Sequence, residues 1–339
     1  MLGLIRMLEG LWLMSSQEIK IGVLGCANIA ERFVIPAINN LEIFNLVAIA
    51  SRTKSKAEQF SKLFNTQAVN SYEELVKRDD IQAVYIPLPN SLHFEWIKKS
   101  LLSGKHVLVE KSMACSADEV NELNDLAREK SLVLLENFQF RKHIQLDKIK
   151  EIISSGDLGE LRCIRSSFGF PPFADKENIR YKKELGGGAL LDAGAYPLKV
   201  AQELTEYSLS VDSASLFYDK EFNVDTWGSA QLKCNSSALT VQVAFGFDHA
   251  YQCNLEIWGS KGILRSNRIF TSPPGVAAEL ELTNGSGAKK ITLEVDNHFE
   301  NMLTYFAELM LSPEKATNEY QNNVKQAQLI EQLRREAYE

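Results

Sequence analysis

The sequence contains few cysteines and has a shortage of positive charge. Its five cysteines are an odd number, and no two of them form a CxxC pair. This pattern excludes a disulfide framework and offers no metal site, so we expect reduced thiols in a cytoplasmic protein. Thirty-seven basic residues against 44 acidic residues give a net charge of −7. That balance disfavours non-specific binding to nucleic acid or to an anionic membrane.

The sequence also lacks long hydrophobic runs, repeats and low-complexity tracts. No stretch approaches the roughly 18 apolar residues of a membrane-spanning helix. Residues 1–17 are mildly apolar, but Glu9 interrupts them and no clear cleavage site follows. We therefore expect an N-terminal extension that is disordered or dispensable, with Met14 as an alternative start. The hydrophobic fraction of 45% is ordinary for a globular protein. The length suggests two domains.

Short apolar runs alternate with helical patterns in the first part of the chain. This alternation predicts a parallel sheet built from βαβ units, and thus a Rossmann dinucleotide-binding domain over residues 18–137. The expected strands cover residues 19–25, 44–51, 83–89, 106–111 and 132–137, and the expected helices cover 29–38, 56–64, 93–104 and 117–130.

Strand-like alternation dominates after a helix expected at 144–154. It predicts an α+β domain over residues 138–339 with a large, mostly antiparallel open sheet that serves substrate binding and oligomerisation. Its final helix is expected to pack back on the first domain. The expected strands cover 161–170, 213–218, 227–234, 238–247 and 251–259, and two further helices are expected at 298–311 and 320–339.

A glycine-containing turn follows the first expected strand. Gly25 to Ala30 (GCANIA) reads as a GxGxxG motif with alanine at its second and third glycine positions. Such a motif needs a tight turn, then small residues where the backbone approaches pyrophosphate and where the helix meets the sheet. A generic strand–turn–helix is the alternative. The following βαβ pattern favours a dinucleotide, with cofactor contacts expected from Gly25, Cys26, Ala27, Asn28 and Ile29.

The end of the second strand indicates which cofactor is used. Enzymes that use NAD usually place an acidic residue there, whereas residues 51–56 read SRTKSK. Three cations at a helix start are unfavourable unless a phosphate balances them. We therefore predict NADP(H), with Ser51 and Arg52 on the 2′-phosphate and Lys56 close by. A solvated basic surface is the alternative.

Two further motifs carry candidate chemistry. Lys111 ends the expected strand 106–111, at the edge of a parallel sheet where ligands bind. Residues 186–197 read GGGALLDAGAYP, and a helical segment there would place Asp192 and Tyr196 on one face. Pro197 would kink that helix or mark its first turn. The alternatives are a surface lysine and a glycine-rich loop in which Tyr196 packs as core.

Taken together, IGVLGCANIA, the Glu110-Lys111 pair and GGGALLDAGAYP resemble the glucose–fructose oxidoreductase/inositol dehydrogenase (Gfo/Idh/MocA) family. The resemblance covers almost the whole chain from Ile19 and implies that Lys111, Asp192 and Tyr196 line the active site. One departure is Ser112, where the family has proline after Glu-Lys. This change is expected to loosen the loop that holds Lys111.

Longer segments, among them AVYIPLPNSLHFEW and ENFQFRKHIQ, are similar to the nucleotide-sugar 3-ketoreductase branch of that family. This implies reduction, with NADPH, of the C3 ketone of a thymidine-diphosphate 3,4-diketo-2,6-dideoxyhexose. Tyr196 would donate the proton, Lys111 would lower the pKa of that phenol and bind the carbonyl, and Asp192 would orient the pair.

Other contacts rest on position alone. His143 and Arg180 are candidate substrate contacts, Arg180 for a diphosphate. Residues 168–173 could stack a sugar or base, although buried packing is the simpler interpretation. The remaining cofactor candidates are Pro87, Leu88, Asn90, His93, Glu110, Lys111 and Asn137.

Two other functions stay open at this point. One is a dehydrogenase of a free sugar, cyclitol or dihydrodiol, and the other is a non-catalytic NADP-binding regulator. Ser112 is the only residue that favours the regulator. The family resemblance also implies a homodimer or homotetramer that forms through the C-terminal sheet.

Overall fold

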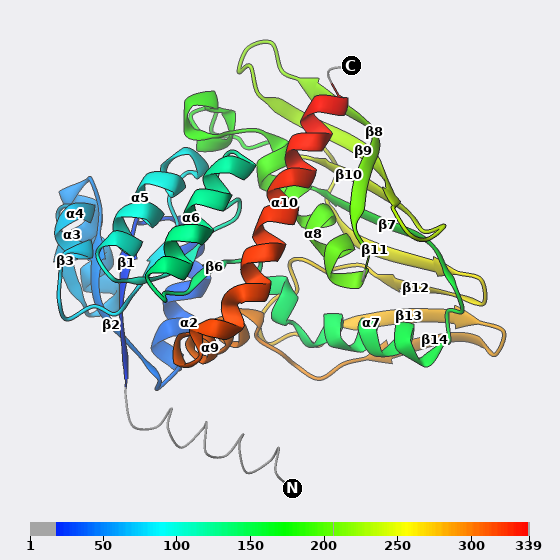
Figure 1. The fold of residues 1–339 in the computed structure, drawn as a ribbon, viewed down its shortest axis with the longest axis horizontal. Helices are drawn as coiled ribbons and strands as arrows, with labels where there is room; N and C mark the ends of the chain where they lie inside the picture. Colours follow the sequence, from blue (N-terminus) through cyan, green and yellow to red (C-terminus); the bar gives the residue numbers. More distant parts are fainter. Residues whose placement is uncertain (1–17, 206, 338–339) are drawn as a thin grey trace, which may run out of the picture.

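The computed structural model describes residues 18–205 and 207–337 of the chain, so the predicted extension over residues 1–17 lies outside the described residues. Two sheets organise what is described, and they lie side by side in Figure 1. Within these residues, no helix is both long and apolar enough to cross a membrane.

The first sheet is the predicted parallel Rossmann sheet. Its strands follow the order β3-β2-β1-β4-β5-β6, and every neighbouring pair is parallel. The order reverses direction between β1 and β4, which is where α/β sheets bind ligands. The strands are β1 (Ile19–Leu24), β2 (Phe44–Ala50), β3 (Gln67–Val69), β4 (Ala83–Ile86), β5 (His106–Val109) and β6 (Leu134–Glu136).

Helices flank this sheet. Their buried residues join those of the strands in one hydrophobic core. The first helix begins with a π-helical turn, η1 (Ala30–Val34). The α-helices are α2 (Ile35–Asn40), α3 (Lys54–Phe64), α4 (Tyr72–Val76), α5 (Asn90–Leu102) and α6 (Ala117–Glu129).

The second sheet is mostly antiparallel, as predicted, and has the strand order β14-β13-β12-β11-β7-β10-β9-β8. The pairing of β7 with β10 is parallel. Its strands are β7 (Leu161–Gly169), β8 (Leu209–Tyr218), β9 (Asp225–Cys234), β10 (Thr240–Gly246), β11 (Gln252–Gly259), β12 (Gly262–Ser266), β13 (Glu279–Asn284) and β14 (Gly287–Thr292).

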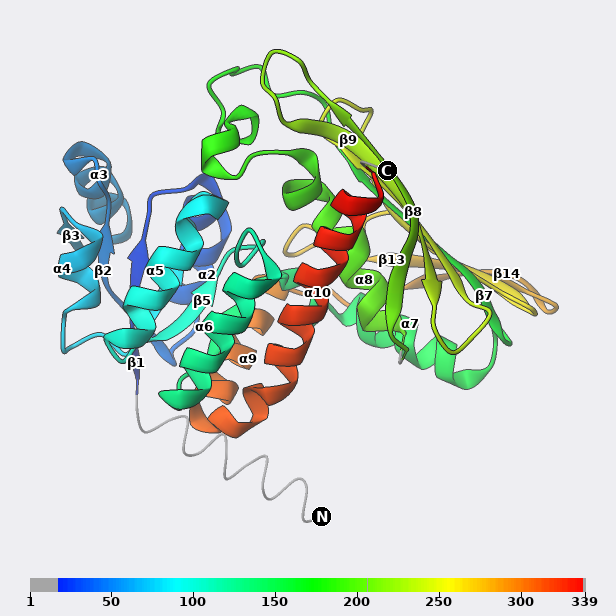
Figure 2. The same cartoon turned by 45° about the horizontal axis from the view of Figure 1, so that its top comes forward.

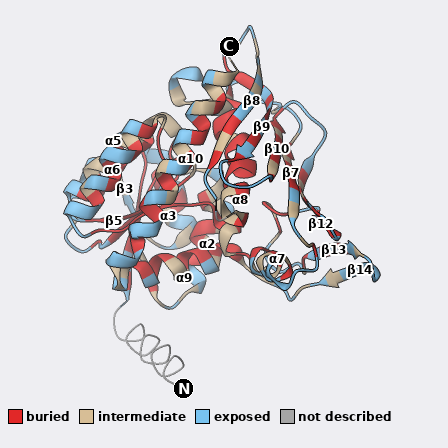
Figure 3. Ribbon diagram, turned by 45° about the vertical axis from the view of Figure 1, so that its right-hand side comes forward, coloured by how far each residue is buried: buried red, intermediate tan, exposed pale blue. Residues whose placement is uncertain are grey.

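Helices cover one face of this sheet and leave the other open (Figure 2). The covering elements include α7 (Ile144–Ser155) and α8 (Ala195–Leu204). Figure 3 shows buried residues concentrated where α8 lies against the strands. This arrangement matches the alternation of buried and exposed residues along β9 from Thr226 to Cys234.

The last two helices join the two parts of the molecule. Apolar residues of α9 (His298–Leu311) belong to the first core. The long α10 (Thr317–Glu336) runs beside both α6 and α8 in Figure 1. It contributes Tyr320 to the first core and Leu329, Ile330 and Leu333 to the second. Because α9 and the start of α10 add residues to the first core, the division of the chain near residue 137 stays a prediction.

Several short elements were not predicted. They include β3, α4, β12 and the hairpin formed by β13 and β14. The hairpin strands are mostly exposed and β14 has no buried residue, so hydrophobic periodicity gives little signal there. The predicted helix at 320–339 begins earlier, at Thr317, and its last two residues lie outside the described part.

Candidate active site

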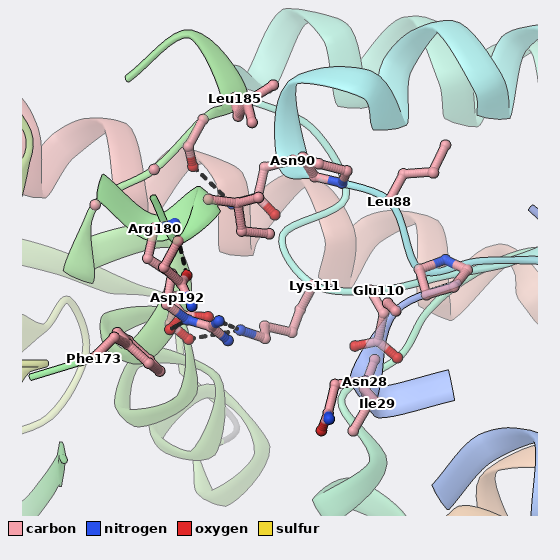
Figure 4. A pocket seen from close by; sticks show the side chains of 18 of the residues that line it. Asn28, Ile29, Leu88, Asn90, Glu110, Lys111, Phe173, Arg180, Leu185 and Asp192 are labelled. Carbon is pink, nitrogen blue, oxygen red and sulfur yellow. Dashed lines mark hydrogen bonds and ion pairs between the residues drawn. The ribbon is translucent and has the colours of Figure 1, made fainter. Parts of the chain in front are cut away.

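A cavity of about 740 Å³ lies between the carboxyl ends of the Rossmann strands and the segment that leads into α8 (Figure 4). This volume suits a small-molecule ligand. The structure brings eleven of the predicted site residues to its wall: Ala27, Asn28, Ile29, Pro87, Leu88, Asn90, Glu110, Lys111, Arg180, Asp192 and Tyr196.

Asp192 connects two cations at the centre of the cavity. Lys111 Nζ donates to the Asp192 backbone oxygen and to Asp192 Oδ1, each at 2.8 Å. Arg180 Nε donates to Asp192 Oδ2 at 2.5 Å. Burial alone would raise the pKa of Asp192, but the charges and hydrogen bonds of Arg180 and Lys111 hold it well below its ordinary value. The carboxylate is therefore ionised and shared between residues from both halves of the chain.

Tyr196 lies next to this cluster on the wall of the cavity. Its ring packs against Phe138, Phe140 and Phe168, with centroid distances of 5.0–5.9 Å, and Lys111 Nζ lies 5.1 Å from the ring centre. Burial, followed by the charges of Glu110 and Asp192, raises the pKa of Tyr196 far above its ordinary value. The predicted lowering of this pKa by Lys111 is therefore wrong for this structure, because the ammonium lies over the ring and pairs with Asp192.

The segment that carries Asp192 and Tyr196 is helical, as predicted, but its first turn is π-helical. The π turn, η5, covers Leu190–Gly194 and continues directly into α8. Pro197 has no N–H to donate to the Ala193 carbonyl, so the regular bond pattern cannot extend back through this turn. The first helix shows a similar combination, since η1 ends at Val34, two residues before a proline, Pro36.

The three glycines before η5 allow close approaches between protein segments. Gly186 and Gly188 have φ values of +72° and +117°. A Cβ at Gly186 would fall 2.9 Å from Asn90 Cβ, and one at Gly187 would fall 2.5 Å from the Arg180 carbonyl oxygen. These glycines line the cavity, and the crowding visible around them comes from the protein itself.

A hydrogen-bonded group lies behind Lys111. Glu110 Oε1 accepts hydrogen bonds from the Tyr85 hydroxyl at 2.7 Å and from Asn137 Nδ2 at 2.6 Å. Burial raises the pKa of Glu110. Asn137 is buried and does not line the cavity, so the structure places it as a support for Glu110 and not as a direct cofactor contact. Tyr85 was not predicted, because in sequence it is one more apolar-strand residue.

His93 also differs from its prediction as a cofactor contact. Its side chain is fully buried, with Nδ1 2.7 Å from the Ser112 carbonyl oxygen and Nε2 2.7 Å from the Leu88 carbonyl oxygen. Burial lowers the pKa of His93 to about 4. His93 thus ties the segment after Lys111 to the turn after β4. The expected loosening by Ser112 is not seen, since Ser112 is buried and Ser112 Oγ also donates to the Leu191 carbonyl at 3.3 Å.

His143, predicted to contact substrate, does not line the cavity. It is buried at the start of α7, where Nδ1 accepts from the Gln145 backbone N–H at 3.1 Å. Its ring packs edge-on against His298, with centroids 5.5 Å apart. Burial lowers the pKa of both histidines. The structural role, which is the ordinary one for a histidine at a helix start, therefore replaces the predicted contact.

The glycine turn has the predicted form. Gly25 has a φ of +124°, and a Cβ there would lie 2.9 Å from Leu88 Cδ2. Ala30 is fully buried where the helix meets the sheet. Ala27 to Ile29 line the cavity at the helix N-terminus, where the first N–H groups have no intrahelical partner. This cradle fits the pyrophosphate of a dinucleotide.

The basic segment lies beside that turn. Ser51 is buried at the end of β2, and Ser51 Oγ accepts from the Thr53 backbone N–H at 3.2 Å. Cys26 Sγ contacts the Lys56 carbonyl oxygen at 3.7 Å, which joins the turn to the start of α3. Arg52 and Lys56 are exposed and outside the 740 Å³ cavity. A 2′-phosphate would therefore meet them at the surface.

Aromatic residues form the far wall of the cavity. Phe168, Phe170 and Phe173 line it, and neighbouring rings in this series have centroids 5.5–5.6 Å apart. They pack on one another, which agrees with the packing interpretation, and because they also line the cavity, stacking of a sugar or base on them stays a prediction. The prediction missed Asp175, Glu177, Asn178 and Leu185, which line the cavity from the loop before the glycines.

The parallel sheet with its glycine turn, followed by a sheet domain that contributes to the same cavity, defines a two-part dinucleotide-dependent oxidoreductase fold. Family models agree: "Oxidoreductase family, NAD-binding Rossmann fold" matches residues 19–138, and "GFO/IDH/MocA C-terminal domain" matches residues 146–265. The chain belongs to the Gfo/Idh/MocA oxidoreductase family.

Characterised relatives are similar over nearly the whole chain. A dTDP-3,4-didehydro-2,6-dideoxy-α-D-glucose 3-reductase of Saccharopolyspora spinosa is 37% identical over 94% of this chain and 97% of its own length. A 3-ketoreductase from Actinomadura kijaniata, solved with NADP and TDP-benzene, superposes with a TM-score of 0.91 at 36% identity, covering 94% of this chain and 98% of that one. A D-xylose 1-dehydrogenase (NADP⁺) of Haloferax volcanii is 31% identical over 84% of this chain and 87% of its own length.

Proposed function

We propose that this protein reduces the C3 ketone of a thymidine-diphosphate 3,4-diketo-2,6-dideoxyhexose with NADPH. The observation that carries the proposal is the convergence of Lys111, Asp192 and Tyr196 in one cavity beside the glycine turn. Similarity to 3-reductases over 94% of the chain supports the substrate class. The free-thiol state of all five cysteines supports a cytoplasmic location.

Binding of the cofactor is assigned to the glycine turn and the basic segment. Ala27, Asn28 and Ile29 would hold the pyrophosphate, while Ser51 and Arg52 would meet the 2′-phosphate. When bound, NADPH supplies a hydride to the ketone carbon. The protein has to orient the ketone and deliver a proton to its oxygen.

We assign Tyr196 as the proton donor. Because burial and the nearby carboxylates raise its pKa, the phenol stays protonated across the physiological range. It gives up the proton only when the developing alkoxide, a stronger base, forms beside it. A raised pKa therefore suits an acid that acts in the reductive direction.

Lys111 would bind the ketone oxygen. An ammonium has three donors, and Asp192 accepts from Lys111 Nζ with both its backbone oxygen and Oδ1. One N–H remains for the substrate, where it would stabilise the negative charge that develops on oxygen. Because Arg180 donates to Asp192 from Nε, its other guanidinium N–H groups are available to donate to substrate oxygens.

The first test follows NADPH absorbance with the thymidine-diphosphate 3,4-diketo sugar, which is generated in situ by the preceding dehydratase, and includes NADH in parallel. We expect NADPH-selective oxidation that falls by about 100-fold or more in Tyr196→Phe, with NADPH affinity unchanged. Tyr320→Phe is the matched control, since Tyr320 is also buried and donates to the Leu132 carbonyl far from the cavity. No oxidation despite NADPH binding would reject this substrate and lead to a screen of free sugars and cyclitols; no turnover of any of them would favour a regulator.

We also propose that the open face of the second sheet forms a homodimer or homotetramer interface. Phe217, Trp227 and Trp258 are 51%, 38% and 46% exposed there. The Phe217 and Trp227 rings stack with centroids 5.4 Å apart. Large exposed aromatic groups on one face indicate a protein–protein contact.

A further inference from the structure

A buried carboxylate lies at the start of the helical segment that carries Asp192 and Tyr196. Asp225 is the first residue of β9, and its side chain is almost completely buried. Asp225 Oδ2 accepts a hydrogen bond from the Leu190 backbone N–H at 2.5 Å. Leu190 is the first residue of η5, two positions before Asp192. The contact thus joins the second sheet directly to the segment that bears the proposed chemistry.

The local sequence is built around this contact. Gly188 has a φ of +117°, and a Cβ there would overlap the Asp225 carboxylate. The third glycine of the run therefore leaves room for a carboxylate that comes from another strand. Burial raises the pKa of Asp225, and the N–H groups of Leu190 and Ala189 oppose that rise.

Such a group acts as a helix cap that comes from a residue distant in the sequence. The first N–H groups of a helix lack partners, and the helix dipole favours negative charge at that end. A side-chain oxygen that accepts from one of them fixes where the helix begins. Here the first turn is π-helical, and Pro197 prevents a regular α-helical bond pattern through it. An outside anchor then sets the position of Asp192.

We propose that Asp225 is a positioning residue for the reaction. It anchors the N-terminus of η5 to the second sheet and so sets the distance from Asp192 and Tyr196 to Lys111. The proposal rests on the proposed function for its effect on turnover, but the anchoring itself does not depend on the substrate.

The test compares Asp225→Ala with Asp225→Asn, which keeps an acceptor oxygen. In Asp225→Ala we expect kcat to fall by about tenfold or more, since a small misplacement of reacting groups is costly, while the NADPH dissociation constant changes by less than about threefold. In Asp225→Asn we expect kcat to stay within about threefold of the wild-type value. Should Asp225→Ala not fold, Asp225→Val, which also lacks an acceptor oxygen, replaces it with the same expectation.

Two further readouts separate positioning from a general loss of stability. Hydrogen exchange at the Leu190 amide should become faster in Asp225→Ala and not in Asp225→Asn, and it needs no substrate. The pH profile of kcat should also gain an acidic limb in Asp225→Ala, because a displaced Asp192 loses the close cations that hold its pKa low.

The matched control is Asp219→Ala in the same β8–β9 hairpin. Asp219 Oδ1 likewise accepts from two backbone N–H groups, those of Glu221 and Phe222, but it does not touch η5. Unchanged kcat and unchanged Leu190 exchange in Asp225→Ala would overturn the proposal. A wild-type protein that does not reduce the diketo sugar would instead reject the proposed function, while Leu190 exchange would still report on the anchor.

Discussion

At the scale of single residues, the charge on Asp192 decides how the site is arranged. One carboxylate, 13% exposed, lies between Lys111 and Arg180, so the cluster carries a net charge of +1. That excess suits a reaction in which negative charge develops on a ketone oxygen. Asp192 also holds Lys111 Nζ, which lies 5.1 Å from the centre of the Tyr196 ring. Burial, followed by the charges of Glu110 and Asp192, keeps the pKa of the phenol high.

The Asp192→Asn substitution should disturb the active site because it removes the negative charge that pairs with Lys111 and Arg180. The change leaves Lys111 and Arg180 close together without a countercharge, so we expect at least one of them to move away and kcat to fall by about 100-fold. NADPH affinity should be little changed, because the cofactor phosphates are assigned to the glycine turn and the basic segment, and Asp192 belongs to neither. Steady-state kinetics with titration of NADPH fluorescence measures both.

Asp175→Asn is the control for that experiment. Asp175 also lines the cavity, but its carboxylate is exposed and accepts only from the Glu177 backbone N–H. An Asp192→Asn enzyme that works as well as Asp175→Asn would show that the shared carboxylate is not needed for the arrangement of the site.

Short sequence motifs identified most of the proposed catalytic residues, but they did not identify the residues that pack around them. Lys111, Asp192, Tyr196 and the glycine turn could be predicted because each lies in a short segment with a local pattern. The contacts of His93, Asn137 and His143 could not be predicted, because a residue that is close in sequence to the site residues can still point its side chain into the core. Tyr85 and Asp225 were missed because their partners are 25 and 35 positions away.

At the scale of elements, strands and helices with clear periodicity were predicted within a few residues, and the polar β13–β14 hairpin was not. The π turn of η5 also escaped prediction. Pro197 indicates that the regular helix is interrupted. The sequence does not show whether the helix kinks there, begins there or contains a wider turn. The structure shows the wider turn.

A buried group of ion pairs and hydrogen bonds joins four elements behind the site. Arg141, in the short helix η2 (Gln139–Lys142), donates to Glu203 of α8 at 2.7 Å and to both carboxylate oxygens of Glu319 of α10 at 2.8 and 3.0 Å. Tyr305 of α9 also donates to Glu319, at 2.8 Å. Arg141 and Glu319 are nearly fully buried, so their interaction is poorly screened by water.

Glu319→Gln should therefore destabilise the protein in a pH-dependent way. Burial would raise the pKa of Glu319, but Arg141 outweighs it and lowers that pKa to about 2. A lowered folded-state pKa stabilises the fold above the ordinary glutamate value, and this contribution is lost as the pH falls towards 2. We expect a loss of about 3 kcal/mol in the free energy of unfolding at pH 7 and a smaller loss near pH 3.

Chemical denaturation at both pH values measures this difference. Glu314→Gln is the matched control, because Glu314 is exposed in the preceding short helix, η6 (Pro313–Ala316). An equal loss at the two pH values would mean that the ionised form of Glu319 is not what stabilises the fold.

At the scale of the whole molecule, the second sheet has two different faces. One packs against α8 and α10 and holds the second core, and the other is open. On the open face, Glu256 pairs with Arg165 and Arg265 at 2.8 Å across three neighbouring strands. Ion pairs of this kind, with exposed aromatic rings beside them, resemble the mixed polar and aromatic composition of protein–protein interfaces.

Replacing the stacked pair with Phe217→Ser and Trp227→Ser together should weaken assembly through this face. The two rings lie on β8 and β9, and their loss removes a large apolar area from the proposed interface. We expect the wild-type protein to run as a dimer or tetramer in size-exclusion chromatography with light scattering, and the double variant to shift towards the monomer. The control, Leu63→Ser with Leu102→Ser, removes two apolar side chains of α3 and α5 that are more exposed than Phe217 and Trp227, and it should leave the mass unchanged. A monomeric wild-type protein would reject the interface. In that case the exposed rings would contact a different partner, because the helices of this chain pack against the opposite face of the sheet.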